Sequence, residues 1–324
     1  MSSNQSLLRK ADLAIADLQS NGGDLQPEEG QSFIRKLIKS PTLLKQIRVV
    51  EMTSPQRIIN KIGFGTRILR KGTQGTALTQ NQRSKPTTEQ VTLTTAEQIA
   101  EVRIPYDVME DNIERATAAN NEASNTGPGG LRSTIIDLIG ERAALDLEEL
   151  GLLADPSYTN GGDADDQAYL AQTTGYLKNA DANGNVVDMA NAGISKAMFK
   201  AGVKAMPDQY LRNKAAMKHF VSVDQEIEWR DTLADRGTAM GDSAVTSDEP
   251  RRAFGSSVEA VMLMPDTKGL FTNPMNLIFG IQRQVSLEFD KDITTRTYII
   301  VLTCRVAFQI EEDEAIVHYK NIAA

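Results

Sequence analysis

The chain has 324 residues, a net charge of −8 at pH 7, one cysteine and two histidines. This length allows about two domains. The single Cys304 excludes an internal disulfide and fits a reducing cytoplasm. Two histidines leave few candidates for a metal site or for a Ser–His or Cys–His catalytic pair. No apolar stretch approaches the roughly 20 residues that cross a bilayer, and no secretory signal opens the chain, so we expect neither a membrane protein nor a secreted one.

The first 50 residues predict an arm of small helices rather than a domain. Residues 6–19 carry apolar side chains at helical spacing and are followed by the breaker Asn21-Gly22-Gly23. A second helix is predicted after Pro27, and a short apolar segment at 43–47 ends the arm.

Residues 63–103 predict a long strand pair with no core of its own. Apolar and polar residues alternate along 91–104, and no aromatic residue lies between Phe64 and Tyr106. A free hairpin of this length is marginal in water, because it buries too little apolar surface to offset the entropy of ordering it. We therefore expect it to lie across another subunit, which favours an assembly protein over a catalyst.

The charge of this segment differs from that of the rest of the chain. Residues 1–90 hold 14 Lys or Arg against 7 Asp or Glu, whereas the remaining residues hold 21 against 36, and no acid lies between Met52 and Thr88. A basic arm on an acidic body favours head-to-tail contact between copies. The alternative is that these charges only keep a loop in solution. The residues expected at the contact are Arg67, Arg70, Lys71, Arg83 and Lys85.

The longest predicted helix covers residues 131–153 and would be about 35 Å long at roughly 1.5 Å per residue. A shorter helix is predicted at 108–118, separated from it by a polar, glycine-rich breaker. Beyond the long helix, residues 155–188 are rich in turn signals and predict loops.

Two helices, at 195–206 and 223–233, precede a polar loop at 234–252. Strict alternation of apolar and polar residues then predicts two long strands, at 277–289 and 298–310. We expect them to form the spine of an antiparallel sheet packed on the long helix, which places the chain in the α+β class.

Residues that could carry chemistry have simpler interpretations. Cys304 lies in an alternating strand and is expected to be a small core residue, and His318 is expected to pack rather than to bind a ligand. Residues 181–185 resemble the start of a calcium loop, but Gly184 is at the fourth position rather than the sixth and Ala192 is at the twelfth, so a hairpin turn is favoured. The acidic runs Glu148-Glu149 and 311–314 predict solvated surfaces or helix ends. We expect no cofactor, no metal and no catalytic residue, and therefore not an enzyme.

Three stretches of the chain resemble the major capsid proteins of tailed bacteriophages, which have the Hong Kong 97-type fold. The motifs are degenerate, so their order along the chain carries the resemblance. The stretches are LLKQIRVV at 43–50, leading through Ser54-Pro55 to Ile62-Gly63; AEVRIPYDVMED at 100–111; and NPMNLIFGIQR at 273–283, followed by CRVAFQ at 304–309 and EAIV at 314–317.

The resemblance implies a division into named parts. Residues 1–60 would be the N-terminal arm, 61–104 the extended loop hairpin, 105–156 with 266–324 the peripheral domain with its spine helix, and 157–265 the axial domain. Some members of the family crosslink a loop lysine to an asparagine of a neighbour with help from a glutamate. Lys71 and Lys85 lie in the corresponding loop, but no matching Asn and Glu can be placed, so noncovalent clasping is expected.

The resemblance further implies a virion protein that assembles in the host cytoplasm into hexamers and pentamers of an icosahedral head around double-stranded DNA. Scaffold and portal proteins, and decoration proteins in some heads, would be its partners. No long scaffolding segment precedes the arm, so the scaffold would be a separate protein or a removed precursor segment. The basic segment lacks the aromatic residues that stack on bases, so contact with packaged DNA would be nonspecific. The alternatives are an encapsulin-like shell around protein cargo and an enzyme of unknown type.

Overall fold

The computed structural model describes most of the chain beyond the N-terminal arm. The described residues are 43–64, 67–69, 71–72, 77–105, 131–159, 164–235, 246 and 249–323. The helices predicted at 6–19, after Pro27 and at 108–118 therefore lie outside the described residues, as does most of the predicted loop at 234–252.

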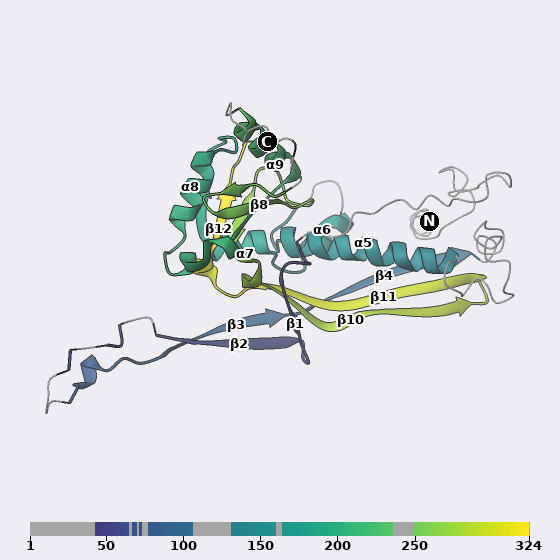
Figure 1. Ribbon diagram of the computed structural model, residues 1–324. Helices are drawn as coiled ribbons and strands as arrows, with labels where there is room; N and C mark the ends of the chain where they lie inside the picture. Colours follow the sequence, from purple (N-terminus) through teal and green to yellow (C-terminus); the bar gives the residue numbers. More distant parts are fainter. Residues whose placement is uncertain are drawn as a thin grey trace.

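A long four-stranded sheet and one long helix form the extended part of the molecule (Figure 1). The strands, in spatial order, are β1 (Arg48–Glu51), β10 (Leu277–Asp292), β11 (Thr297–Ile310) and β4 (Ala96–Pro105). β1 is parallel to β10, whereas β10 and β4 are both antiparallel to β11. Helix α5 (Leu131–Leu153) runs along this sheet. The long helix and the two long strands predicted from the sequence are confirmed.

The core between α5 and the sheet depends on close contact at the end of the helix. Leu150 and Leu152 are fully buried in one cluster with Cys304 and Phe308. A Cβ atom at Gly151 would lie 2.7 Å from Cε1 of Phe308, so only glycine lets the helix approach the strand this closely. The expected core position of Cys304 is confirmed, and burial raises the pKa of its thiol.

A second, six-stranded sheet lies beside the first (Figure 1). Its strands, in spatial order, are β5 (Asn185–Asp188), β12 (Ile316–Lys320), β9 (Gly269–Thr272), β6 (Lys218–Val221), β8 (Ser256–Ala260) and β7 (Arg252–Ala253). Helices α7 (Tyr176–Asn183), α8 (Lys196–Ala205) and α9 (Val223–Ala234) contact this sheet, whereas α6 (Ala164–Leu170) lies beside α5. The short 3₁₀ segments are η1 (Gln80–Gln82), η2 (Tyr210–Ala216), η3 (Pro274–Asn276) and η4 (Asp313–Ala315).

Helices α8 and α9 begin where the sequence predicts, because each has a serine N-cap. The Ser195 side chain accepts a hydrogen bond from the Met198 amide, and the Ser222 side chain accepts one from the Gln225 amide. In these helices local signals and tertiary packing agree.

Several local expectations are wrong because long-range pairing overrides them. Residues 48–51 form a strand beside β10 rather than part of a helical arm. Residues 155–188 contain α6 and α7 rather than loops alone, and Asp181 lies in the last turn of α7 rather than in a hairpin turn. The strand pair predicted for 63–103 is also divided, since β4 joins the four-stranded sheet.

Among the described helices, none combines the length and apolar character that crossing a bilayer requires. The described residues also hold no group of three or more His, Cys, Asp or Glu that could bind a metal ion.

Candidate functional site

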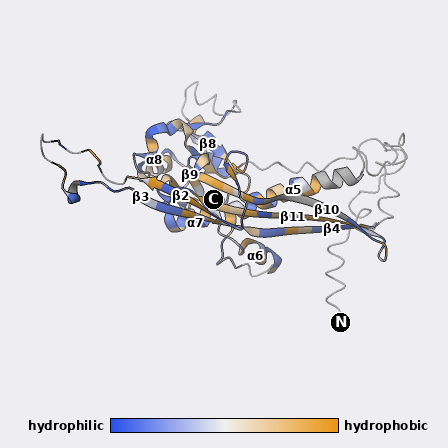
Figure 2. Cartoon of the chain, turned by 90° about the horizontal axis from the view of Figure 1, so that it is seen from below, coloured by the Kyte–Doolittle hydropathy of each residue, from blue (hydrophilic) through white to orange (hydrophobic). Residues whose placement is uncertain are grey.

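The most exposed structure of the described chain is a two-stranded hairpin that projects beyond both sheets (Figure 1). Strand β2 (Gln56–Gly63) pairs antiparallel with β3 (Thr87–Thr94), from Gln56 opposite Thr94 to Gly63 opposite Thr87. Most side chains on both strands are exposed. Figure 2 shows hydrophobic as well as hydrophilic stretches along it. The hairpin therefore has backbone pairing but little core of its own, as the sequence predicts, although its first strand ends at Gly63 rather than beginning there.

A small cluster of buried side chains fixes the base of the hairpin. Leu93 of β3 is 1% exposed and packs with Val50, Met52, Ile278 and Ala307. The cluster joins the hairpin to β1, β10 and β11, so the burial that the hairpin lacks along its length is concentrated where it meets the body.

A lysine provides a second attachment. Lys61 Nζ donates a hydrogen bond to the Glu311 carbonyl oxygen at 2.6 Å and lies 3.2 Å from a Glu312 carboxylate oxygen and 3.6 Å from one of Glu89. Its side chain is only 19% exposed, so this contact is less screened by water than a surface ion pair. Burial raises the pKa of neighbouring Asp313, with Lys61 acting in the opposite direction.

The cations expected at an inter-subunit contact lie beyond these attachments. Arg67, Lys71, Arg83 and Lys85, called here the basic tip, are all exposed, whereas Arg70 lies outside the described residues. The two arms of the tip are joined at one point, because the Ser84 hydroxyl donates a hydrogen bond to the Arg67 carbonyl oxygen at 3.2 Å. No ion pair involves the basic tip within the described residues. Whether its members contact a neighbouring copy stays a prediction.

The hairpin also exposes apolar side chains that the sequence analysis missed. Six of the exposed large hydrophobic residues in the described chain lie between residues 58 and 78. They are Ile58, Ile62, Phe64, Ile68, Leu69 and Leu78, with Leu69 84% exposed. Concentrated apolar exposure is a common feature of interaction surfaces. Ile58, Ile62 and Phe64 are separated by even numbers of residues, so the sequence alone predicts that they share one face of a strand. The spacing does not show that this face is exposed.

A buried carboxylate holds the segment that leads into β1. Glu148 of α5 is 1% exposed and accepts hydrogen bonds from the amides of Leu43 and Leu44 at 3.1 and 3.4 Å. The expectation that Glu148 is part of a solvated surface is therefore wrong. A buried carboxylate requires such donors, because water no longer stabilises it.

Comparison with known proteins decides what kind of protein carries these features. No protein-family model matches the chain. The prophage capsid protein YqbE of Bacillus subtilis (strain 168) is 38% identical over 325 residues, which cover 97% of each chain. The chain belongs to the family of prophage capsid proteins.

Solved capsid structures share the fold of this capsid protein at low sequence identity. The capsid of the empty GTA particle has a TM-score of 0.61 at 16% identity, covering 96% of this chain and 100% of that one. The procapsid of satellite phage P4 with its size determination protein has a TM-score of 0.62 at 12% identity, covering 98% and 95%. The Mycobacterium phage Cain structure has a TM-score of 0.59 at 12% identity, covering 96% and 98%. The resemblance to tailed-phage capsid proteins proposed from the sequence is confirmed.

Both histidines of this capsid protein are core residues. His219 is fully buried, stacks on Phe271 at 4.1 Å between ring centroids, and has its Nδ1 3.0 Å from the Tyr319 hydroxyl. Burial lowers the pKa of His219 to about 3. Burial also lowers the pKa of His318 to about 4, although the Asp181 carboxylate 3.4 Å away acts in the opposite direction. Both rings are therefore neutral in the folded protein, which fits packing.

Proposed function

We propose that this chain is the self-assembling subunit of an icosahedral tailed-phage head that encloses double-stranded DNA, and that its role is structural rather than catalytic. Membership of the capsid protein family supports the first part. The observation that carries the mechanism is the hairpin, which presents unpaired cations and uncovered apolar side chains beyond its own subunit.

The hairpin would act as a noncovalent clasp. Each strand has eight residues, so at roughly 3.3 Å per residue the paired region reaches about 26 Å and the tip extends further. The apolar residues would be buried against a neighbouring copy, and the basic tip together with Arg70 would meet its acidic body. Opposite charges would set the orientation of the contact, while apolar burial would supply most of its stability.

The division into parts fits this role. Residues 1–60 would form the N-terminal arm, 61–104 the extended loop, 105–156 with 266–324 the peripheral domain, and 157–265 the axial domain, as in a Hong Kong 97-type subunit. Strands β9 and β12 would connect the peripheral and axial domains. They belong to residues 266–324, but they pair in the six-stranded sheet with strands from residues 157–265.

Copies of this chain would form hexamers and pentamers through heterologous contacts that close into rings. The satellite phage P4 procapsid includes a size determination protein, and we propose that scaffold and portal proteins, and decoration proteins where present, likewise act with this chain. Assembly would take place in the host cytoplasm and the product would be the virion capsid. Packaged DNA would be contacted through its phosphates, without reading of sequence.

Electron microscopy of the recombinant chain, expressed alone and with its neighbouring open reading frames, tests this proposal. Closed shells or capsomer rings are expected, with no enzymatic activity needed to form them. A folded chain that stays monomeric under all scaffold and salt conditions would contradict it.

An encapsulin-like shell around protein cargo is the alternative with the same fold. The 38% identity to a prophage capsid protein favours the phage head. The contents of particles from the native source separate the two: nuclease-resistant DNA supports the head, and a packaged protein without DNA supports the alternative.

A further inference from the structure

Helix α8 presents a row of lysines to solvent. Lys196, Lys200 and Lys204 are four residues apart, so they lie along one face of the helix, and all three are exposed. The opposite side of the helix is buried through Met198 and Phe199. We call these three residues the lysine row.

Helix α9 presents a row of the opposite charge. Asp224, Glu228, Asp231 and Asp235 follow a spacing of four, three and four residues, which is one face of a helix, and all four are exposed. An adjacent side of this helix is buried through Gln225 and Trp229. We call these four residues the acidic row.

The two rows do not pair with each other inside the subunit. No ion pair or side-chain hydrogen bond involves either row within the described residues. The buried sides of the two helices contact each other, since the Phe199 and Trp229 rings are 4.8 Å apart. Helix α8 packs over β5 and β12 at one edge of the six-stranded sheet, and α9 packs over β8 near the other edge (Figure 1). A head-to-tail ring requires complementary surfaces on each subunit, and the two rows supply opposite charges.

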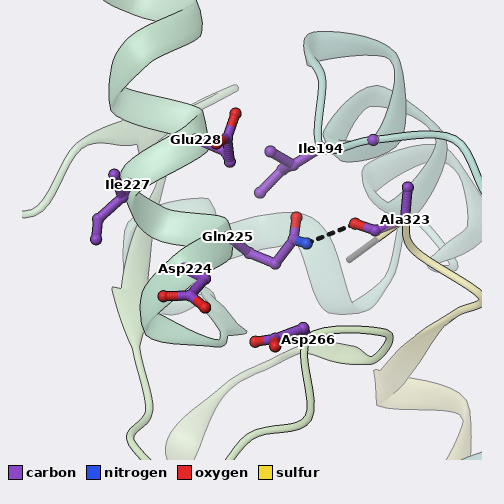
Figure 3. Close-up of a pocket in the computed structure, with 8 residues that line it drawn as sticks. Ile194, Asp224, Gln225, Ile227, Glu228, Asp266 and Ala323 are labelled. Atoms are coloured by element: carbon purple, nitrogen blue, oxygen red, sulfur yellow. Dashed lines mark hydrogen bonds between the residues drawn. The ribbon is translucent and has the colours of Figure 1, made fainter.

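A pocket at the start of the acidic row is lined by carboxylates. It has a volume of about 510 Å³, and Asp224, Glu228 and Asp266 supply carboxylates around it. Gln225 projects into it (Figure 3), is 3% exposed, and donates from Nε2 to the Ala323 carbonyl oxygen at 2.7 Å. Its Oε1 atom is buried without a hydrogen-bond partner.

This arrangement suits a cation from outside the subunit. Asp224, Glu228 and Asp266 place three carboxylates around one pocket. A lysine ammonium has three donors and no acceptor, so it can serve several carboxylates together.

We infer that the acidic row of one copy receives the lysine row of the next copy in the ring, with a lysine of α8 placed among the carboxylates of Asp224, Glu228 and Asp266. This inference rests on the proposed function, because it names a contact that closes the rings. It accounts for both unpaired rows with one contact.

Charge reversal on one helix at a time tests the inference. The α8 variant is Lys200→Glu with Lys204→Glu, and the α9 variant is Glu228→Lys with Asp231→Lys. Asp224 is left in place because an acid in the first turn stabilises its helix. Arg212→Glu with Lys214→Glu, at exposed positions of η2, is the matched control.

Each single-helix variant should remain folded by circular dichroism yet form rings at least about tenfold more weakly than wild type in sedimentation velocity. The chain that combines both variants should recover, because its rows attract again with exchanged signs. A mixture of the two variants should give hexamers but not pentamers, since attraction requires the two kinds of copy to alternate and an odd ring cannot alternate.

Zero-length carbodiimide crosslinking gives an independent result on the unmodified protein. In shells built from ¹⁴N- and ¹⁵N-labelled copies, mixed-label crosslinks between α8 lysines and α9 carboxylates are expected. Single-helix variants that assemble like wild type, or the absence of mixed-label crosslinks between the rows, would overturn the inference and leave the shell function intact. A wild-type chain that never assembles would instead overturn the proposed function and the inference with it.

Discussion

Leu93→Ala tests whether the hairpin can open while the rest of the subunit stays folded. The side chain is 1% exposed within the cluster of Val50, Met52, Ile278 and Ala307. Removing a buried leucine side chain to Cβ costs about 2–5 kcal/mol, since apolar contacts are lost and a cavity remains. This cluster and the contacts of Lys61 attach the hairpin to the body. We therefore expect the lost free energy to appear as local opening of the hairpin rather than as unfolding of the body.

Hydrogen exchange measured by mass spectrometry reads this opening directly. Amides of β3 should exchange faster by about 30-fold or more, which corresponds to the lower end of that cost. Exchange in β9 and β6 should be unchanged. The same variant should assemble poorly, because a hairpin that is no longer held at a fixed angle to the body cannot reach a neighbouring copy.

Leu69→Ala is the matched control, as it makes the same chemical change in the same hairpin. Leu69 is 84% exposed, so its truncation should change subunit stability by less than about 0.5 kcal/mol. It should nevertheless weaken assembly, because Leu69 belongs to the apolar surface proposed to be covered by a neighbour. Wild-type exchange in β3 and wild-type assembly in Leu93→Ala would refute the reasoning about the base of the hairpin.

Three further predictions concern the buried carboxylate, the buried histidine and the basic tip. Glu148→Ala leaves the amides of Leu43 and Leu44 without an acceptor and should lower the free energy of unfolding by about 2–4 kcal/mol in urea titration, with faster exchange at those two amides. His219, with a folded pKa near 3, is neutral in the folded protein but takes up a proton in the unfolded chain below about pH 6.5, so its contribution to stability is present above that pH and is lost as the pH falls towards 3. By about pH 4.5 this loss amounts to about 2–3 kcal/mol, and His219→Phe should flatten the fall in stability between those pH values; an unchanged slope would contradict the assignment. Reversal of the four charges of the basic tip to Glu should leave the melting temperature within a few degrees of wild type but abolish shell formation at physiological salt, and assembly equal to wild type would argue that these cations only keep the loop in solution.

Elements defined by local signals could be predicted from the sequence. Helix α5 and strands β10 and β11 follow from long periodic patterns bounded by breakers, and α8 and α9 follow from periodicity together with a serine N-cap. The extended hairpin can be predicted because its alternating segment has too few apolar residues to build a core of its own. In these segments local preference and tertiary structure agree.

Features that depend on distant partners could not be predicted. Residues 96–105 alternate like a hairpin strand, yet their partner is β11, some 200 residues later in the chain. Glu148 resembles any acidic residue on a helix until the amides of residues 43 and 44 are placed against it. The acidic and lysine rows are visible in the sequence as spacings, but only the fold shows that they do not pair within one subunit. Long-range pairing decides each of these cases, and periodicity carries no information about it.

The path of the hairpin in an assembled particle tests the central claim most directly. A cryo-electron microscopy reconstruction of shells formed by this chain would show it. The account predicts that β2 and β3 cross onto a neighbouring copy, with Leu69 and the basic tip covered by that neighbour's surface. A hairpin that folds back on its own subunit, or stands uncovered in solvent within a closed shell, would contradict the account.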